Sequence, residues 1–215
     1  HLDQLPTVQT STLAGFYLDR FEMSNRRYKA FCDTTARPYP AAPWWDDGYF
    51  FDSPDAPVIQ VSWEDSLAYC FWAGKTLPTA LEMEKSMRGL DGNRFPWGNF
   101  EASRQYVHAN IPPSLGAENL LQLPAMVPLR VDDIRFPPSV YGAYHLAGNV
   151  QEWCADLPPY LGWLPSQPAG QYRVAKGGSL ASPATMLTGW FVQPLLTNRR
   201  RWDLGFRGLV KGCPE

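Results

Sequence analysis

Two stretches, Leu146-Ala-Gly-Asn-Val-Gln-Glu-Trp153 and Lys176-Gly-Gly-Ser179, carry much of what the sequence says about its architecture. The glycine pair in the second stretch lets backbone approach backbone where a larger residue could not fit. A third stretch, Pro96-Trp-Gly-Asn99, is typical of a tight turn that presents one large aromatic side chain to a core. Trp, Gly and Pro supply packing and geometry rather than proton transfer, so we interpret these stretches mainly as scaffold.

The composition around these stretches indicates one folded domain. The chain has 215 residues, of which 45% are hydrophobic and 19% charged, enough for one sizeable core. We find no internal repeat and no boundary, and therefore expect a single domain over residues 1–215. The 21 prolines, 17 glycines and 30 aromatic residues (9 Trp, 10 Tyr and 11 Phe) favour long ordered loops over a helix bundle.

Charge and hydropathy exclude several classes of partner. A net charge of -2 and a pI near 5.9 leave no basic surface for nucleic acid or for an anionic membrane. We interpret Arg199-Arg-Arg201 as a solvated or ion-paired turn. No apolar stretch approaches the roughly 20 residues that span a bilayer. Residues 1–15 lack the basic-then-apolar order of a signal peptide, so we expect a cytoplasmic rather than a secreted protein.

Capping patterns predict three short helices. Ser24 precedes a helical segment that extends through Cys32. Capping boxes that begin at Ser62 and at Thr79 predict helices over 63–73 and 80–88. Glycines at positions 74 and 89 end these two helices.

The remaining sequence predicts short strands and long loops. The strand candidates are Gly15–Asp19, Tyr172–Lys176 and Gly205–Val210, and the last could pair with the first. Pro, Gly and aromatic residues dominate 37–58, 91–100, 110–140 and 157–170, which we expect to be loops. The predicted fold class is therefore α+β, with few helices, short antiparallel strands and long ordered loops.

The four cysteines, Cys32, Cys70, Cys154 and Cys213, are widely separated. They form no CxxC pair and no Cys/His cluster with zinc-ligand spacing. We expect buried thiols, and one disulfide is compatible with the sequence.

In its order of motifs, the sequence resembles the formylglycine-generating enzyme and sulfatase-modifying factor family, which has a C-type-lectin-like fold. The resemblance covers about residues 15–210, nearly the whole chain. The matching blocks are Phe16–Asp19, Glu22–Asn25, Pro57–Trp63, Ala73–Thr79, Phe95–Asn99, Tyr141–Tyr144, Leu146–Trp153, Lys176–Ser179 and Leu204–Arg207.

The resemblance also identifies a chemistry that is missing. In the family's enzyme, two cysteines after the Gly-Gly-Ser block bind copper and oxidise a substrate cysteine. The same spacing places Ser182 and Leu187 at these positions. A hydroxyl and an aliphatic group cannot replace the two soft thiolates that Cu(I) requires. We therefore expect no catalysis by this mechanism.

Other chemistries find no better support. The related iron-dependent sulfoxide synthases need a histidine-rich site, and this chain has only His1, His108 and His145, without H-x-x-x-H-x-E spacing. No G-x-S-x-G elbow, phosphate loop or GxGxxG motif occurs. Adjacent acids such as Asp132 and Asp133 are typical of solvated or turn-forming loops, and we assign them no catalytic role.

Calcium is the one cofactor of the family that the residues present leave open. The family's cation site would use Gly148, Val150 and Glu152, which match, but His145 replaces an oxygen donor. Imidazole is a poor ligand for a hard cation. The alternative is that Glu152 accepts backbone N–H bonds and orders the loop. A second family site would involve Asn110 and Ile111.

Sugar binding in the manner of C-type lectins has weaker support. The nearest strings to the lectins' calcium and glycan motifs are Gln193-Pro-Leu195 and Trp202-Asp203. Both strings lack the acid or amide that the lectin motif requires.

Residues 180–204 lie where the family's enzyme has its active site, and they show no regular period. Their location, the lost cysteines and the irregular aromatic-rich content resemble the variable proteins of diversity-generating retroelements, which carry mutable positions in such a segment. We expect an exposed surface that binds an unidentified protein or small molecule. Its candidate residues are Leu180, Ser182, Pro183, Thr185, Leu187, Trp190, Phe191, Gln193, Leu196, Asn198, Arg200 and Trp202.

Three functions follow from these observations. The first is a non-catalytic ligand-binding protein of the variable type. The second is an enzyme of the same family with an unidentified mechanism, at a pocket lined by Trp44, Trp45 and the aromatics near Trp190. The third is a sensor domain cut from a longer chain. The competing structural interpretation of the segment is that Leu187, Phe191 and Leu196 simply fill the core, and side-chain exposure distinguishes it from a binding surface.

Overall fold

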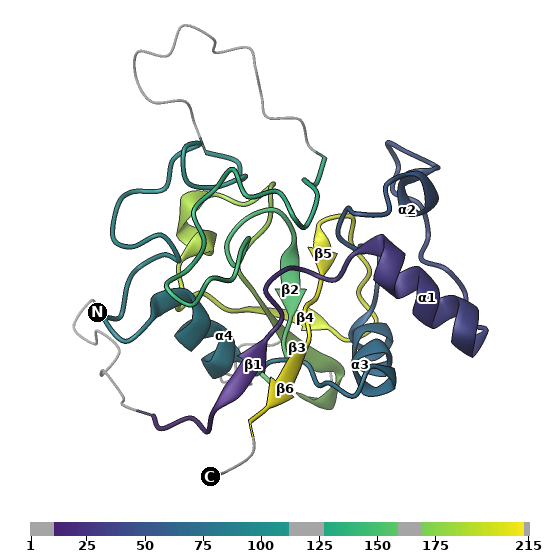
Figure 1. Ribbon diagram of the computed structural model, residues 1–215, viewed down its shortest axis with the longest axis horizontal. Helices are drawn as coiled ribbons and strands as arrows, with labels where there is room; N and C mark the ends of the chain where they lie inside the picture. The colour runs from purple at the N-terminus through teal and green to yellow at the C-terminus, as the bar shows by residue number, and fades with distance from the viewer. Residues whose placement is uncertain (1–10, 112–126, 159–168, 213–215) are drawn as a thin grey trace, which may run out of the picture.

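A computed structural model describes residues 11–111, 127–158 and 169–212 of the chain. Two small β-sheets lie at the centre, with helices on either side and long irregular segments above them (Figure 1). Within the described ranges, no helix has the length and apolar character needed to cross a membrane. This arrangement confirms the predicted α+β class.

The three predicted helices are present, and their capping groups explain where they begin. The Ser24 hydroxyl accepts from the Arg27 N–H and caps α1 (Asn25–Thr35), which runs three residues past the predicted end. Complete capping boxes open α3 (Trp63–Trp72) and α4 (Ala80–Arg88). Gly74 and Gly89 follow them with φ of +70° and +67°, a conformation that favours glycine.

A fourth helix, α2 (Tyr49–Asp52), lies inside the segment that was predicted to be loop. It is a single turn without a side-chain cap. The Asn25 side-chain amide at the start of α1 donates to the carbonyls of Tyr49 and Ser53, at 3.2 and 2.9 Å. Tertiary hydrogen bonds therefore hold this turn, and no local sequence pattern predicts it.

The ends of the described chain meet in a two-stranded sheet. Strand β1 (Phe16–Leu18) pairs antiparallel with β6 (Leu209–Lys211), and Tyr17 lies opposite Val210. This confirms the predicted pairing of the first and last strands. The single strand predicted over 205–210 is wrong in one respect, because it divides into β5 (Leu204–Gly205) and β6, which belong to different sheets.

The second sheet has the order β4-β3-β2-β5. Strand β3 (Tyr172–Lys176) matches its predicted bounds, whereas β2 (Gln151–Trp153) and β4 (Gln193–Leu196) were not predicted. The β4–β3 and β3–β2 pairs are antiparallel, but β2 and β5 are parallel. The expectation of purely antiparallel strands therefore needs this correction. Pro194 fits β4 because β4 is an edge strand.

The core lies on both sides of this sheet. On one side α1 and α3 pack Phe31 and Tyr69 against Trp153 and Phe206. On the other side α4 contributes Met83 and Met87, together with the side chain of Leu187 from the segment 180–204. Each such side chain stabilises the fold by about 1.5–3 kcal/mol through burial.

Three of the cysteines are buried free thiols: Cys32, Cys70 and Cys154. They confirm the expected buried thiols and form no disulfide with one another, while Cys213 lies outside the described residues. Burial raises the pKa of Cys70 to about 12, and it raises the pKa of Cys154 further still. Thiols in this state are protonated and poorly reactive at neutral pH.

Candidate functional site

The segment 180–204 leaves β3 through Gly177-Gly178 and returns through β5 (Figure 1, light green to yellow). It contains the short 3-10 helix η3 (Ala184–Leu187) and the edge strand β4. Gly178 has φ of +63°, and a Cβ atom at this position would lie 3.0 Å from the Leu187 side chain. The glycine pair therefore permits the close packing that the sequence predicted.

The two positions that hold cysteines in the family's enzyme are internal here. Ser182 is 5% exposed, and its Oγ accepts a 2.9 Å hydrogen bond from the Ser179 N–H. The Ser179 hydroxyl in turn donates to Asp203 Oδ2 at 2.7 Å. Leu187 has no exposed surface and packs in the core beside α4. These side chains therefore support the loop from within.

This burial corrects part of the predicted surface. Leu180, Ser182 and Leu187 were expected to face a ligand, but all three are buried. These three side chains belong to the buried part of the fold, because this part of the chain packs directly on the core. For Leu187, the core-filling interpretation holds.

The other candidates reach solvent. Trp190 is 51% exposed. Phe191 and Leu196 are half-buried, so the core-filling interpretation does not describe them. Also half-buried are Gln193 and Trp202, and the exposed members are Pro183, Thr185, Asn198 and Arg200.

Contacts with Arg88 and with Lys176 hold Trp190 and its neighbours in place. The Arg88 guanidinium of α4 lies over its ring, 5.4 Å from the centroid. The fully buried Lys176 donates from Nζ to the carbonyls of Gly189 and Phe191, at 2.7 and 3.1 Å. Burial lowers the pKa of Lys176. The residues on both sides of Trp190 are thus fixed by a lysine inside the protein.

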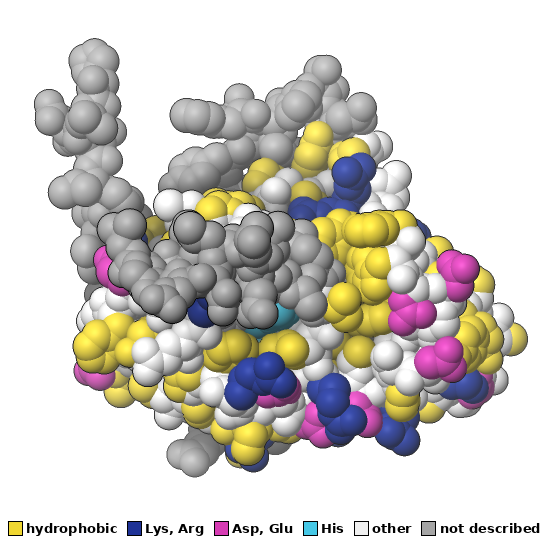
Figure 2. All heavy atoms as spheres, turned by 90° about the horizontal axis from the view of Figure 1, so that it is seen from above, with side chains coloured by type: hydrophobic (Ala, Val, Ile, Leu, Met, Phe, Trp, Pro, Cys, Tyr) yellow, Lys and Arg dark blue, Asp and Glu magenta, His cyan; other side chains and the backbone are white. Residues whose placement is uncertain are grey.

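Trp202 belongs to a second aromatic group, which we call the tryptophan cluster: Trp44, Trp45 and Trp202. The rings of Trp45 and Trp202 meet edge to face with centroids 5.3 Å apart, and Trp44 packs on Trp45 at 5.5 Å. Trp44 is 78% exposed. Trp45, which was predicted to line a pocket together with the aromatics near Trp190, thus contacts Trp202 of the segment 180–204. Figure 2 shows hydrophobic side chains gathered on the upper face of the molecule, beside Lys and Arg side chains.

The arginine run after β4 forms ion pairs. Arg200 contacts Asp65 of α3 at 2.5 Å and donates to the Gln60 carbonyl at 3.0 Å. Arg201 makes two contacts of 2.8 and 2.6 Å with the buried carboxylate of Asp203. The run thus agrees with the ion-paired turn predicted from the sequence, and Arg200 connects the segment to α3.

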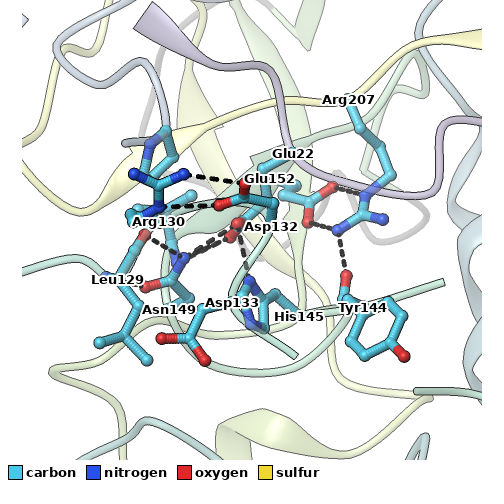
Figure 3. Close-up of polar contacts among 12 residues, drawn as sticks. Glu22, Leu129, Arg130, Asp132, Asp133, Tyr144, His145, Asn149, Glu152 and Arg207 are labelled. Atoms are coloured by element: carbon cyan, nitrogen blue, oxygen red, sulfur yellow. Dashed lines mark hydrogen bonds and ion pairs between the residues drawn. The ribbon is translucent and has the colours of Figure 1, made fainter. Parts of the chain in front are cut away.

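The block that could hold calcium contains a buried ion pair instead (Figure 3). Arg207 binds both carboxylate oxygens of Glu152, through Nε and Nη2, at 2.6 Å each. Arg207 also donates to the Tyr144 carbonyl at 2.8 Å. Burial raises the pKa of Glu152, and the guanidinium opposes this shift. The carboxylate is therefore already neutralised by a cation of the protein itself.

A second buried carboxylate, Glu22, lies beside this pair and was not assigned a role from the sequence. It accepts hydrogen bonds from His145 Nδ1 at 3.1 Å, from Asn149 Nδ2 at 2.9 and 3.1 Å, and from the Val150 N–H at 3.3 Å. The donors are nitrogen atoms, not oxygen ligands. In the sequence, the only indication of a structural role for Glu22 was its place in the family-matching block Glu22–Asn25.

The calcium candidates do not fit a calcium ion in this arrangement. Gly148 allows its backbone to lie close to that of His108, because a Cβ atom at position 148 would be 2.6 Å from the His108 carbonyl oxygen. Val150 and Glu152 are fully buried. In the parts of the chain that the structure describes, no group of three or more His, Cys, Asp or Glu side chains could hold a metal ion. The second site, at Asn110 and Ile111, stays a prediction.

The adjacent acids Asp132 and Asp133 also form ion pairs with arginines. Asp132 binds Arg130 through two contacts of 2.9 Å, and Asp133 binds Arg135 at 2.7 Å (Figure 3 draws the Arg130 pair). Hydrogen bonds from these arginines lower the pKa of both carboxyls. Carboxylates that stay ionised in exposed ion pairs are poor general acids at neutral pH.

Comparison with known proteins was made for sequence and for structure. Residues 3–211 match the sulfatase-modifying factor enzyme 1-like domain. The formylglycine-generating enzyme of Mus musculus is 33% identical over 225 residues, covering 78% of this chain and 58% of the mouse protein. The inactive C-alpha-formylglycine-generating enzyme 2 of Mus musculus is 37% identical over 158 residues, covering 65% of this chain and 47% of the mouse protein. The chain therefore spans about half the length of these relatives.

Among solved structures, variable protein 1 of Treponema denticola superposes with a TM-score of 0.69 at 19% identity. The alignment covers 92% of this chain and 84% of that protein. At this identity the likeness establishes a shared fold.

Proposed function

Because this chain belongs to the sulfatase-modifying factor enzyme 1-like family, yet has neither cysteine of the copper site, we propose that it is a non-catalytic ligand-binding protein of the retroelement variable type. Its recognition surface is the solvent-accessible part of residues 180–204. The tryptophan cluster extends this surface through the contact between Trp45 and Trp202. Its ligand is an unidentified protein or small molecule.

The observation that carries this proposal is the division of the segment into buried and exposed halves. Ser182 and Leu187 face inward, where one is hydrogen-bonded and the other is packed. Trp190 and Trp44 reach solvent, and Trp190 is held by the Lys176 hydrogen bond to the Gly189 carbonyl and by the Arg88 contact with its ring. Exposed aromatic side chains on a rigid frame are typical of interaction sites.

The names of similar proteins agree with this proposal. One relative is named as an inactive formylglycine-generating enzyme, so the family includes members without the activity. One protein with the same fold is named as a variable protein. Both names support the proposal, and neither protein's function is assigned to this chain by the likeness.

The alternative is an enzyme with a different mechanism, and its support is the 33% identity to a formylglycine-generating enzyme. An activity assay separates the two. The protein is incubated with a cysteine-containing peptide, Cu(I) and oxygen, and the peptide is followed by mass spectrometry, with the mouse enzyme as positive control. We expect the peptide to keep its sulfur. Conversion of the cysteine above the protein-free background would overturn the non-catalytic assignment.

The retroelement origin is tested in the flanking DNA. We expect a reverse transcriptase gene and a near-copy of the codons for 180–204 that differs from them at adenines. The differing codons should encode the exposed positions, such as Thr185, Trp190 and Asn198, and spare Leu187. A neighbourhood without either feature, or changes concentrated at the buried positions, would contradict this origin.

A further inference from the structure

A cavity of about 610 Å³ is separate from the proposed recognition segment, since none of the described residues that line it belongs to 180–204. Residues 13–18, which include β1, line it. Lys85 and Ser86 of α4 and the residues Tyr141–Ala143 line it as well. Figure 1 shows β1 and α4 lying beside each other at this place. The volume is within the range of small-molecule sites, about 300–1,000 Å³.

Two features of the lining residues leave the cavity unfilled: an unpaired strand edge and two glycines. Strand β1 pairs with β6 along one edge, and within the described residues no other strand pairs with it. Gly15 and Gly142 both line the cavity, and a Cβ atom built on either would have no heavy-atom neighbour within 4 Å. Tyr17 and Tyr141 stand at the rim and are 75% and 54% exposed. The site therefore combines an apolar interior with aromatic side chains at its mouth.

Two cations line the cavity without a carboxylate partner. Among the described residues, neither Arg20 nor Lys85 forms an ion pair, although most other lysines and arginines of the surface do. The acids close to them in the sequence pair with other cations: Asp19 binds Lys75, Glu82 binds Lys211 and Glu84 binds Arg88. The described residues that line the cavity therefore include these two cations and no carboxylate.

Aromatic rings hold both cations in place. The Arg20 guanidinium lies 5.4 Å from the ring centroid of Phe21 and 5.2 Å from that of Tyr144. The Lys85 ammonium lies 5.8 Å from the Tyr141 ring. Such contacts orient a cation but leave its charge and its N–H donors available to an anion.

We propose that this cavity binds a small organic anion with an apolar, preferably aromatic, body. Arg20 and Lys85 bind the anionic group, a carboxylate, sulfonate or phosphate. Tyr17, Tyr141 and the backbone of 13–15 contact the body. The site does not depend on the proposed recognition surface, because the two share no residue.

The test uses a pair of fluorescent probes that differ in charge. 8-Anilinonaphthalene-1-sulfonate has an aromatic body and one anionic group, and N-phenyl-1-naphthylamine has the same body without the charge. We expect saturable binding of the sulfonate to the intact protein. The double variant Arg20→Gln/Lys85→Gln should bind it about tenfold more weakly or worse, because two charge-assisted contacts are lost.

A matched control removes two charges elsewhere. Arg27 and Arg37 also form no ion pair among the described residues, and Arg37 likewise lies over an aromatic ring, at 5.5 Å from Phe31. The variant Arg27→Gln/Arg37→Gln should bind the sulfonate as the wild type does. Neither double variant should change the affinity for the neutral probe. Equal loss in both double variants, or no loss in Arg20→Gln/Lys85→Gln, would overturn the proposal.

A second measurement needs no variant. Acetic anhydride acetylates lysines of the wild-type protein, and mass spectrometry gives the extent at each one. The sulfonate should slow acetylation at Lys85 and leave Lys29, which pairs with Asp33 on the exposed face of α1, unchanged. Failure to protect Lys85 at saturating probe would show that the probe binds elsewhere.

Discussion

Arg207 and Glu152 form a bidentate ion pair with two contacts of 2.6 Å, and neither side chain has more than about 1% of its surface exposed. The pair joins β2 to the backbone between β5 and β6. It therefore connects the central sheet to the segment that leads into the terminal sheet. It also explains why 205–210 divides into two strands, because the guanidinium at position 207 is drawn into the interior between them.

Breaking this pair should be costly. The variant Glu152→Gln leaves a buried guanidinium without its counter-charge, and we expect a loss of about 3–5 kcal/mol in the free energy of unfolding. Urea denaturation measures it. The control is Arg26→Gln, which removes an exposed pair with Asp55 and should cost no more than about 1 kcal/mol. A loss at Glu152 as small as that of the control would contradict the structural role.

Calcium should not stabilise the protein. Both Glu152 oxygens are bound by Arg207, and the neighbouring Glu22 is surrounded by nitrogen donors. We expect the thermal midpoint to be the same with excess calcium and with a chelator. A bound ligand at 100 times its Kd would instead stabilise by about 2.7 kcal/mol. A calcium-dependent rise in the midpoint that Glu152→Gln abolishes would show that the site exists.

The two halves of the recognition segment should respond differently to substitution. Leu187→Ala opens a cavity in the core and should cost about 2–5 kcal/mol. Thr185→Ala and Asn198→Ala should stay within about 0.5 kcal/mol of the wild type. Trp190→Ala loses its contact with Arg88 and should cost about 1 kcal/mol. Chemical denaturation measures the free energy of unfolding of the four variants. A large loss of stability in Thr185→Ala or Asn198→Ala would show that these side chains help to hold the fold.

Local signals in the sequence predicted the helices well, because a capping box is a short-range pattern. Ser62 with Asp65 and Thr79 with Glu82 both form the expected pairs of hydrogen bonds. The strands were harder to predict. Strands β2 and β5 have only three and two residues, too few to show a period of two. Their pairing depends on partners distant in the chain.

The site was only partly predictable for the same reason. The resemblance located Ser182 and Leu187, but their burial depends on contacts with Ser179 and with the core around α4. The contact of Trp45 with Trp202 joins residues from opposite ends of the chain, and no local pattern announces it. Glu22 lies 127 positions from its partner Asn149.

Alkaline pH should destabilise the protein through its buried acids. The folded-state pKa values of Cys70 and Tyr69 are both raised to about 12, from ordinary values of 9.0 and 10.0. A raised pKa in the folded state means that the unfolded chain loses its proton first. Stability is therefore complete below pH 9 and falls as the pH rises above it, by up to about 1.4 kcal/mol per pH unit for each group.

Replacement of thiols separates this effect from general charge repulsion. The variant Cys70→Ala/Cys154→Ala should be less stable at pH 7, because two core side chains become smaller, but its stability should fall less steeply above pH 9. Denaturation curves at several pH values give the slope. Parallel slopes for variant and wild type would show that these thiols do not titrate as the structure implies.

Lys176 should control the mobility of the Trp190 loop. Its ammonium donates to the Gly189 and Phe191 carbonyls, while the amide of Gly189 donates to Arg94 and that of Phe191 to Thr188. Lys176→Met keeps the unbranched side chain, one atom shorter, and removes these donors. We expect faster hydrogen exchange at the amides of residues 189 and 191 than in the wild type.

The matched control is Lys29→Met, which removes an exposed ammonium paired with Asp33 on α1. It should leave exchange at residues 189 and 191 unchanged. In Lys176→Met, amides of β2 and β3 should keep most of their protection, because the expected effect is local opening rather than global unfolding. If all protected amides accelerate together, Lys176 acts on overall stability. If only the loop accelerates, this buried lysine sets the rigidity with which Trp190 is presented to a ligand.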